Sequence, residues 1–573
     1  MAAFKKEHID FSKIEKARLA RETISEGLEP YTGPFELAQK KHLLNRTMMA
    51  LSSKHLADLD KLSLKESLDV LFTKEQFPDL PVNDYYYEIT KEETEKQGYY
   101  YVAPGEPYHE APEPNNSPWP RYTSFDVWLY KNMIRQKTSI HWRLVFFLHQ
   151  LVPATQPNGV KIYFQHYELL FNSCFDSYKT FISNMTKDPL MLDYLNLQSS
   201  NKTKPDENYA RELQELFTVG KGPNSKYTED DVVEFARVLV GWRYDYETKN
   251  KAGRVQTVFN MWNHDDKDKK LSAFYGNTTI QGIAGYDGHK ELDQLIDIIF
   301  STSECPLYIC RRLYQFFCNP IIDTTTEQNI IVPMAEILVK NNFTLTAPLK
   351  ALLGSAHFFN ASNFNSIIKS PIEFILKFYK EFEFTLYNWE APTDIPEQFA
   401  SGITKDFYQL KSLTWNISNL GLNFPYPLNV SGWPAFYQAP VYDMFWLNSD
   451  TLSKRSDLAN GFARWGMWVG PGKTKGNVNL QINWISYLST FKNPENFDSV
   501  LSEIETRIMG PLISEKSKTR IKNYVLGGFP NSYWTEMYTA YKNNPSIENQ
   551  NTISNRLQNL FSSVFQLPEF HLF

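Results

Sequence analysis

Cysteine is scarce in this chain of 573 residues, which contains four cysteines. This number is too small to cross-link a chain of this length, so we do not expect a disulfide framework. None of the four forms a CxxC or CxxCH pattern, which removes support for zinc-ribbon and c-type haem sites. Because Cys310 and Cys318 lie in the apolar run ICRRLYQFFC, we expect buried free thiols.

Long apolar runs and an excess of basic charge are also missing. No stretch approaches the roughly 20 apolar residues of a membrane-spanning helix. The N-terminal MAAFKKEHIDFSKIEKARLARETI lacks the apolar run of a signal peptide. A net charge of −6, from 59 basic and 65 acidic residues, supplies no field that would attract nucleic acid. We therefore predict a protein that is not transmembrane, shows no export signal and does not bind nucleic acid.

The common catalytic motifs are absent as well. The chain has no G-x-S-x-G elbow, Walker loop, Rossmann glycine pattern or H-E-x-x-H helix, so the corresponding nucleophile, nucleotide and zincin classes lose support. Aromatic residues, in contrast, make up 15% of the chain. Such a content suits either an aromatic core or a surface that stacks on sugars or partners.

Apolar residues recur at helical spacing along most of the chain, which predicts a mainly α fold: a large multi-helix single body with irregular loops rich in proline and aromatics and minor β content. We expect an N-terminal helical extension at 1–30, a core at 31–470 and a C-terminal helical part of the same body at 471–573. The proline-rich interval of about 85–122 predicts an ordered surface insertion. A short strand is expected in VQTVFNMWNHDDKDKK.

The segment DENYARELQELFTVGKGPNSKYTEDDVVEFARVLVGW, residues 206–242, predicts two helices joined by a glycine-rich turn. The first should end at Gly220. One of its faces carries the polar side chains of Asn208, Arg211, Glu212 and Glu215. The second should start with a capping box between Thr228 and Asp231 and keep Glu234 and Arg237 as a polar pair. Such faces form ion-paired networks, metal sites or acid–base sites, of which the network is the commonest.

Several ordered motifs resemble those of a bacterial family called domain of unknown function 1800, over most of the chain. They are HLLNRT at His42, RLVFFLHQLVP at His149, TKDPLMLDYL at Asp188, ENYARELQELFTVG with YTEDDVVEFARVLVGW, HDD at His264, IKSPIEF at Lys369 and NVSGWP at Trp433. Within IHWRLVFFLHQLVP, which is apolar on nearly every side, the polar exceptions are His141, Arg143, His149 and Gln150.

The resemblance implies a helical bacterial protein without an assigned activity. Family members are often exported and often encoded beside a sulfatase-like family, which implies envelope or polysaccharide work and suggests a sulfatase-like protein or a polysaccharide as partner. Because this chain shows no export signal, its localisation stays open. Where the family typically reads Trp-His-Asn-His-Phe, this chain reads LHQLV, so Leu151 replaces the second histidine. If that histidine binds metal in the family, Leu151 cannot do so.

Two kinds of active site are compatible with these residues. A divalent transition metal would need converging ligands, for which His149, His264 and Asp265 are the candidates together with the two glutamates. A lone histidine on an apolar helix is more often a hydrogen-bonded core residue, and a polar loop is more often solvated. A carboxylate-based hydrolase would instead use Glu212 or Glu215 with a pKa raised by burial, and Arg211 or Arg237 would hold substrate anions.

The candidate substrate-binding residues are Asn208, Tyr209, Trp242, Lys369 and Trp433. Trp433 is either a core anchor or a stacking platform, and Lys369 either precedes a helix start or contacts an anion there. The first functional hypothesis is thus a metal-assisted or carboxylate-based hydrolase. The alternative is a non-catalytic binding or scaffold protein of a bacterial cell-surface assembly, which would use the aromatic loops 98–120 and 424–446 for recognition.

Overall fold

The computed structural model describes residues 24–573 except 114–116, 156–158, 383, 387–388, 391–392, 394–396, 398–402, 473–475 and 510–512. Most of the predicted helical extension at 1–30 therefore lies outside the described residues, and its described part, 24–30, contains no helix. The prediction of a mainly α-helical single body is confirmed, because one hydrophobic cluster joins buried residues from Leu43 to Phe570.

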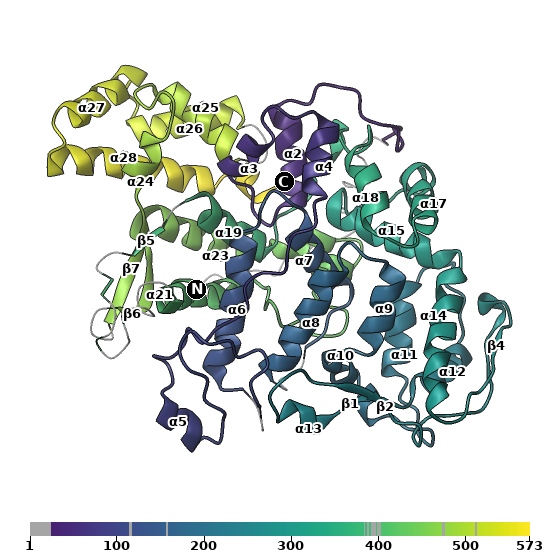
Figure 1. Ribbon diagram of the computed structural model, residues 1–573. Coiled ribbons are helices and arrows are strands. Elements are labelled where there is room, and N and C mark those ends of the chain that lie inside the picture. Colours follow the sequence, from purple (N-terminus) through teal and green to yellow (C-terminus); the bar gives the residue numbers. More distant parts are fainter. Residues whose placement is uncertain are drawn as a thin grey trace, which may run out of the picture.

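A row of neighbouring helices forms the middle of the molecule (Figure 1). It consists of α6 (Trp119–Ile134), α7 (His141–Leu151), α8 (Val160–Ser173), α9 (Tyr178–Thr186) and α14 (Glu291–Ser301). Every residue of α7 is buried, although the helix contains His141, Arg143, His149 and Gln150. Since an apolar surface on all sides is typical of a core helix, its few polar groups must find partners inside the protein.

The remaining helices surround this row. Those of the first half are α2 (Leu37–Thr47), α3 (Ser53–Asp58), α4 (Leu64–Leu71), α5 (Lys91–Lys96), α10 (Pro189–Tyr194), α11 (Asn208–Glu212), α12 (Glu229–Leu239) and α13 (Tyr246–Lys249). Those that follow α14 are α15 (Glu304–Phe317), α16 (Thr324–Thr326), α17 (Val332–Lys340), α18 (Thr346–Leu353), α19 (Pro371–Glu381), α21 (Ile403–Asn419), α22 (Pro434–Tyr437) and α23 (Ser449–Asn460).

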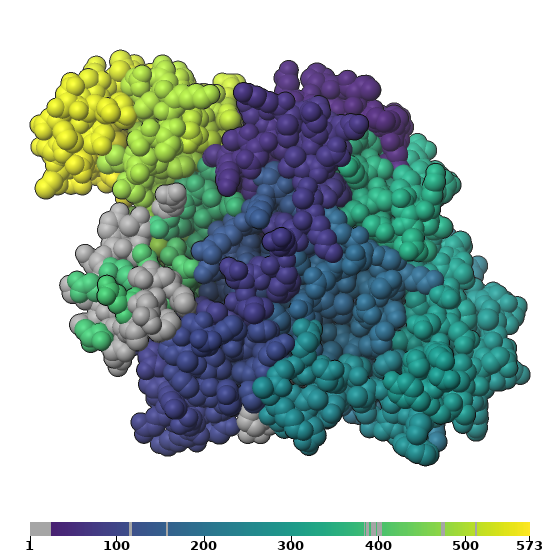
Figure 2. All heavy atoms as spheres, in the orientation of Figure 1, coloured from purple at the N-terminus to yellow at the C-terminus, as the bar shows by residue number. Residues whose placement is uncertain are grey.

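The C-terminal helices are α24 (Trp484–Ser489), α25 (Phe497–Arg507), α26 (Glu515–Leu526), α27 (Asn531–Asn543) and α28 (Ile547–Phe565). They stand as a lobe at one corner of the molecule, beside the N-terminal helices (Figure 2). α28 packs against α24, α26 and α27, and the rings of Trp484 and Phe561 stack with centroids 3.9 Å apart. Aromatic packing of this kind accounts for part of the high aromatic content.

Strands are few and short, as predicted. β1 (Trp242–Tyr244) pairs antiparallel with β2 (Thr257–Phe259), which lies in the segment expected to hold a strand, and β3 (Lys269–Lys270) pairs with β4 (Thr279–Ile280). The third sheet has the order β5 (Phe384–Leu386), β7 (Gly476–Ile482), β6 (Met467–Gly472), with Phe384 opposite Ile482 and Met467 opposite Leu480.

Several local predictions are confirmed. Thr228 and Asp231 form the expected capping box of α12, and Gly220 has the left-handed φ of +82° that suits a residue after a helix. All four cysteines are buried and free. Among the described helices, none is both long enough and apolar enough to cross a membrane.

The proline-rich interval is anchored to the body by its tyrosines. Tyr85 and Tyr108 are buried and meet edge to face, with ring centroids 6.1 Å apart, and the Arg121 guanidinium lies 5.7 Å from the Tyr108 ring. Apart from α5, the described residues between 85 and 118 form no helix or strand. These tyrosines therefore serve as core anchors of the insertion.

Candidate functional site

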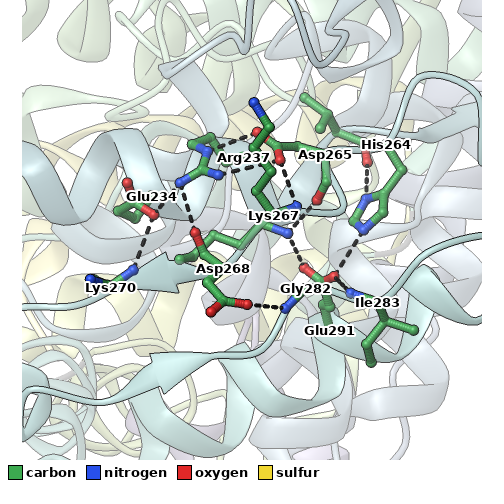
Figure 3. A network of polar contacts seen from close by, with 12 residues as sticks. Glu234, Arg237, His264, Asp265, Lys267, Asp268, Lys270, Gly282, Ile283 and Glu291 are labelled. Atoms are coloured by element: carbon green, nitrogen blue, oxygen red, sulfur yellow. Dashed lines mark hydrogen bonds and ion pairs between the residues drawn. The ribbon is translucent and has the colours of Figure 1, made fainter.

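Arg237, Asp265 and His264 belong to one polar network that joins α12, the loop 263–268 and α14 (Figure 3). Arg237 Nε donates to Asp265 Oδ2 at 2.8 Å, and its Nη1 donates to Glu234 Oε2 at 2.6 Å and to the Asp268 carbonyl at 3.1 Å. Asp265 also accepts from the main-chain N–H of Lys267 at 2.9 Å. The Arg237 guanidinium group and the Asp265 carboxylate thus already form hydrogen bonds with each other and with the loop.

His264 lies at the buried end of this network. Its Nδ1 lies 3.0 Å from the Val240 carbonyl oxygen, and its Nε2 lies 3.0 Å from Glu291 Oε1. Glu291 is fully buried and also receives the Lys269 ammonium at 2.5 Å and the Ile283 N–H at 2.7 Å. Because both ring nitrogens of His264 face protein oxygens, a metal ion would have to displace one of them.

The predicted metal ligands do not converge. His149 on α7 lies against Tyr167, Phe424 and Trp433, whereas His264 lies against Phe259 and Glu291. Within the described part of the chain, no three His, Cys, Asp or Glu side chains are arranged to hold a metal ion. A divalent metal at these positions therefore stays a prediction without a preformed set of ligands.

Glu212 and Glu215 lie where α11 passes into a π-helical segment, Leu213–Thr218. Glu215 pairs with Lys221 at 2.5 Å, and Arg211 is bound by Glu229 at 2.7 Å. No hydrogen bond between described residues involves the Glu212 side chain. Burial, and after it the charge of Glu215, raises the pKa of Glu212 to about 7. Widened helical turns of this kind often occur at functional sites. A catalytic role for Glu212 stays a prediction.

The other predicted binding residues on this segment lie apart from one another. Asn208 is exposed, but Tyr209 is fully buried, with its hydroxyl 2.8 Å from that of Thr186. Trp242 is half-buried in β1, with the Lys187 ammonium 5.9 Å from its ring. Only Asn208 shares the accessible side of α11 with Glu212.

Family motifs from distant parts of the chain meet at α7. A cavity of about 40 Å³ lies between α7, α15, the start of α19 and the segment 435–446, which includes most of α22. Its polar lining consists of Arg143, Gln150, Arg312, Gln315, Glu373, Tyr442 and Asp443. Arg143 forms a buried ion pair with Glu373. Leu151 also lines the cavity, so the position of the missing family histidine faces this space.

Several buried polar groups at and beside this cavity have no hydrogen-bond partner within the described structure. Those of the cavity lining include Arg143 Nε and both polar atoms of the Gln150 amide; His149 Nε2 and Trp433 Nε1 are also without a partner among the described residues but belong to residues that do not line the cavity. Trp433 is 1% exposed, and its ring lies 5.8 Å from that of His149. A buried donor or acceptor without a partner costs about 1–3 kcal/mol. Their grouping in one place marks a site where a ligand or ordered water would be stabilised.

The surroundings of the cavity carry an excess of positive charge. Arg143 and Arg312 line the cavity, and Arg46 lies beside it over the Phe573 ring. Four further basic side chains are buried but do not line it, namely Lys41, Lys369, Lys377 and Arg455, and the buried carboxylates compared with them are Glu373, Asp443 and Glu505. Most of these cations are satisfied by main-chain carbonyls: Arg46 donates to Asn363 at 2.9 Å, Arg455 to Lys369 at 2.8 Å and Lys369 to Phe570 at 2.6 Å. Because a carbonyl group carries no net charge, these hydrogen bonds leave the positive charges of the side chains without a compensating negative charge.

The pKa values reflect this crowding. Burial lowers the pKa of Lys377 to about 8 and that of Arg455 to about 9. Burial, and after it the charges of Lys377, Lys41 and Arg455, lowers the pKa of Lys369. Arg46 and Arg143 both lie over the Phe573 ring, 5.2 and 5.4 Å from its centroid. An anion placed among these groups would relieve their mutual repulsion.

The backbone is strained at the edge of the cavity. Tyr442 has a φ of +37°, which is unfavourable for a residue with a side chain. Its hydroxyl accepts a hydrogen bond from Gln315 Nε2 at 3.0 Å. Strained residues persist only where the surrounding contacts hold them in place, and they are commonest at functional sites.

Comparison with known proteins supports the family resemblance of the sequence motifs. The sequence model of a family described as "Protein of unknown function (DUF1800)" matches residues 42–572. The chain belongs to the DUF1800 family. No curated protein and no solved structure matches the chain. In this DUF1800 protein, the motifs at His149, Lys369 and Trp433 lie around the α7 cavity, whereas the motif at His264 belongs to the network of Figure 3.

Sequence reasoning singled out Lys369, Trp433 and His149 but missed most of the cavity lining. Lys369 precedes the start of α19, as predicted, where Ser370 and Glu373 form a capping box, and its ammonium group is buried against the Phe570 carbonyl. Arg312, Gln315, Glu373 and Tyr442 were not proposed as site residues. The available signal was the presence of Arg143 and Gln150 in a helix that is otherwise apolar.

His264→Ala tests whether the network of Figure 3 holds the fold together. The change removes a partner from buried Glu291 and from the Val240 carbonyl, so we expect a loss of about 2–4 kcal/mol in the free energy of unfolding. Denaturant unfolding measures it. His289→Ala, at a half-exposed histidine nearby, should cost less than about 1 kcal/mol. Equal stability of the His264→Ala variant and the parent protein would contradict a structural role.

Glu212→Gln tests the raised pKa. Because the pKa of about 7 lies above the ordinary 4.5, folding favours the protonated carboxyl group. This stabilisation is complete below about pH 4.5 and is lost as the pH rises to about 7. The glutamine of the variant stays neutral at every pH. We therefore expect the decrease in the free energy of unfolding between pH 5 and pH 8 to be smaller in the variant by roughly 1 kcal/mol, a value that allows for the partial exposure of the side chain.

The measurement is the difference between the free energies of unfolding at pH 5 and pH 8. Glu336→Gln, at an exposed carboxylate on α17, serves as the control and should leave the difference as it is in the parent protein. If Glu212→Gln behaved like this control, Glu212 would have an ordinary pKa.

Proposed function

We propose that this DUF1800 protein binds a small oxyanion, or the anionic group of a larger ligand, in the cavity beside α7. The observation that carries the proposal is the grouping of unpartnered donors there: Arg143 Nε and the Gln150 amide are buried and lack hydrogen-bond partners among the described residues. A guanidinium group and an amide N–H are the donors that commonly bind carboxylate, phosphate and sulfate oxygens.

The charge around the cavity supports an anion over a neutral ligand. Arg143 is paired with Glu373, whereas Arg46 next to it makes its hydrogen bonds to the Asn363 carbonyl and the Ser366 hydroxyl and interacts with the charge of Asp443. Arg312 adds a second guanidinium group to the lining and Asp443 a second carboxylate, which also accepts from the Ile368 N–H at 2.8 Å. Since charges attract more strongly away from water, an anion held here gains more than it would at the surface.

The size of the cavity limits the ligand. A space of about 40 Å³ holds roughly three water molecules, at about 10–15 Å³ for each. One carboxylate, phosphate or sulfate group is of comparable size, whereas a polysaccharide chain is far larger. A polysaccharide could therefore present only one anionic substituent to this cavity. An envelope location and a sulfatase-like partner are further proposals, which rest on the family resemblance alone.

Carboxylate-based hydrolysis is a second candidate function, favoured by the pKa of Glu212 at about 7. A carboxyl group that titrates near neutrality can both give and take a proton. Tyr308 on α15 donates to the Leu216 carbonyl in the π-helical segment at 2.6 Å, and Arg312 lies one turn further along the same helix. α15 thus joins the Glu212 segment to the cavity, which supports a shared role for the two.

Isothermal titration with phosphate, sulfate and acetate in low-salt buffer tests the binding proposal. We expect saturable 1:1 binding of at least one of these anions. Gln150→Leu removes both unpartnered amide atoms at similar volume and should weaken binding about tenfold, the equivalent of about 1.4 kcal/mol. Gln97→Leu, an exposed glutamine after α5, is the matched control.

Circular dichroism establishes that each variant is folded. We avoid replacing Arg143 first, because that change leaves Glu373 buried without its partner and costs about 3–5 kcal/mol of stability. Absence of binding by all three anions, or equal affinities of the Gln150→Leu and Gln97→Leu variants, would contradict an anion site in this cavity.

A further inference from the structure

A second cavity of about 620 Å³ lies in another part of the molecule and shares no lining residue with the first. It is an open hollow between α3, the segment 70–76, the loop 135–139 and Lys380 near the end of α19. Its volume falls within the range of small-molecule sites. The proposed oxyanion site does not use it.

Basic side chains dominate the lining of this second cavity. They are Lys54, Lys74, Arg135, Lys137 and Lys380, and the carboxylates among them are Asp58 and Glu75. Burial raises the pKa of Glu75, while the charges of Lys137 and Lys380 act in the opposite direction. The cavity is therefore a local concentration of positive charge on a protein whose net charge is −6.

Three of the lysines are available to a ligand. Lys74 contacts Asp176 at 3.9 Å and Arg135 contacts Asp406 at 3.6 Å. Lys54, Lys137 and Lys380, in contrast, make no ion pair with any residue that the structure describes. Lys380 donates to the Gln136 carbonyl at 3.0 Å, and burial, with the charge of Lys54, lowers its pKa to about 8. Ammonium groups that repel one another favour a shared anionic partner.

The wall behind these lysines is a fixed, buried structure. The Gln136 side chain donates to the Ser139 carbonyl at 2.7 Å and accepts from the Met49 N–H at 2.8 Å, so it holds the loop 136–139 in place. The Gln136 carbonyl accepts from His55 Nε2 at 3.2 Å. His55 is 1% exposed and lines the cavity, and its Nδ1 has no hydrogen-bond partner in the described structure.

These contacts leave Nδ1 of His55 as an acceptor without a donor. Because Nε2 faces a carbonyl oxygen, it carries the ring hydrogen, and Nδ1 keeps its lone pair. Burial, followed by the charge of Lys380, lowers the pKa of His55 to about 4, in keeping with a neutral ring. An ordinary patch of surface charge has no such buried, unpartnered group, so His55 Nδ1 and the unpaired lysines together distinguish this cavity from one.

We infer that this cavity binds a small ligand that carries two or more phosphate groups. Each phosphate bears a charge of about −1.5 to −2 at neutral pH, so a diphosphate matches three unpaired ammonium groups better than a single carboxylate or sulfate does. Lysines bind phosphate as mobile point charges and need no planar geometry. The diphosphate would lie between Lys54, Lys137 and Lys380, against the wall formed by His55 and Gln136, and a protonated phosphate oxygen would donate to His55 Nδ1.

Isothermal titration with inorganic pyrophosphate tests this inference on the full chain. We expect 1:1 binding at low ionic strength that weakens when salt is added, because the lysines are partly exposed. The Lys54→Gln/Lys137→Gln double variant should weaken it at least tenfold, and Lys380→Gln should do the same. Lys54 and Lys137 are exposed, so their replacement leaves folding intact. Lys340→Gln, an exposed lysine on α17, is the control and should bind as the parent protein does.

The two proposed sites can fail independently. Gln150→Leu should leave pyrophosphate affinity unchanged, because the first cavity of about 40 Å³ is too small for a diphosphate. Loss of phosphate or sulfate binding in that variant, with pyrophosphate binding retained, would support both sites. No binding of pyrophosphate, or an equal affinity in the Lys54→Gln/Lys137→Gln and Lys340→Gln variants, would overturn the inference drawn here.

Discussion

Arg143 on α7 and Glu373 on α19 form an ion pair that is almost completely removed from water. Moving two such charges out of water is costly, and their attraction offsets the cost only when the other polar atoms are also satisfied. Glu373 is held further by Ser370, which it caps at the start of α19. Arg143 Nε has no such partner within the described residues. The central helix is therefore fixed by a pair whose cationic member is incompletely satisfied.

This imbalance extends to the neighbouring basic groups. Arg46, Lys369 and Arg455 are buried, and their described bonds are made mainly to main-chain carbonyls. Natural proteins rarely bury charge in this way without a functional reason, because it reduces stability. An anion in the α7 cavity would compensate the charge, so the same feature that lowers stability would make binding favourable.

The helical fold and several local features could be predicted from the sequence because they depend on neighbouring residues. The capping boxes at Thr228 and Ser370 and the predominantly apolar sequence of α7 are features of this kind. The partners of the polar residues could not be predicted. His264 bonds to Glu291, 27 residues away, and Arg143 bonds to Glu373 across 230 residues.

The candidate site shows the same division between local and distant information. Trp433, Lys369 and His149 stood out by motif, and all three are buried, but none of them lines the α7 cavity. Their roles depend on the path of the segment 435–446, which no periodicity describes. Glu212 and Arg237, although both lie in the same segment 206–242, belong to different surroundings: Glu212 lies beside Glu215, and Arg237 lies within the network of Figure 3.

The most direct test of the central claim is the anomalous diffraction of crystals soaked in selenate, which reports the position of an oxyanion. The account predicts a selenium peak in the α7 cavity, with its oxygens within hydrogen-bond distance of the Arg143 guanidinium and the Gln150 amide. A cavity that contains only water, or in which Gln150 is bonded to protein groups while selenate stays at the surface, would contradict the account.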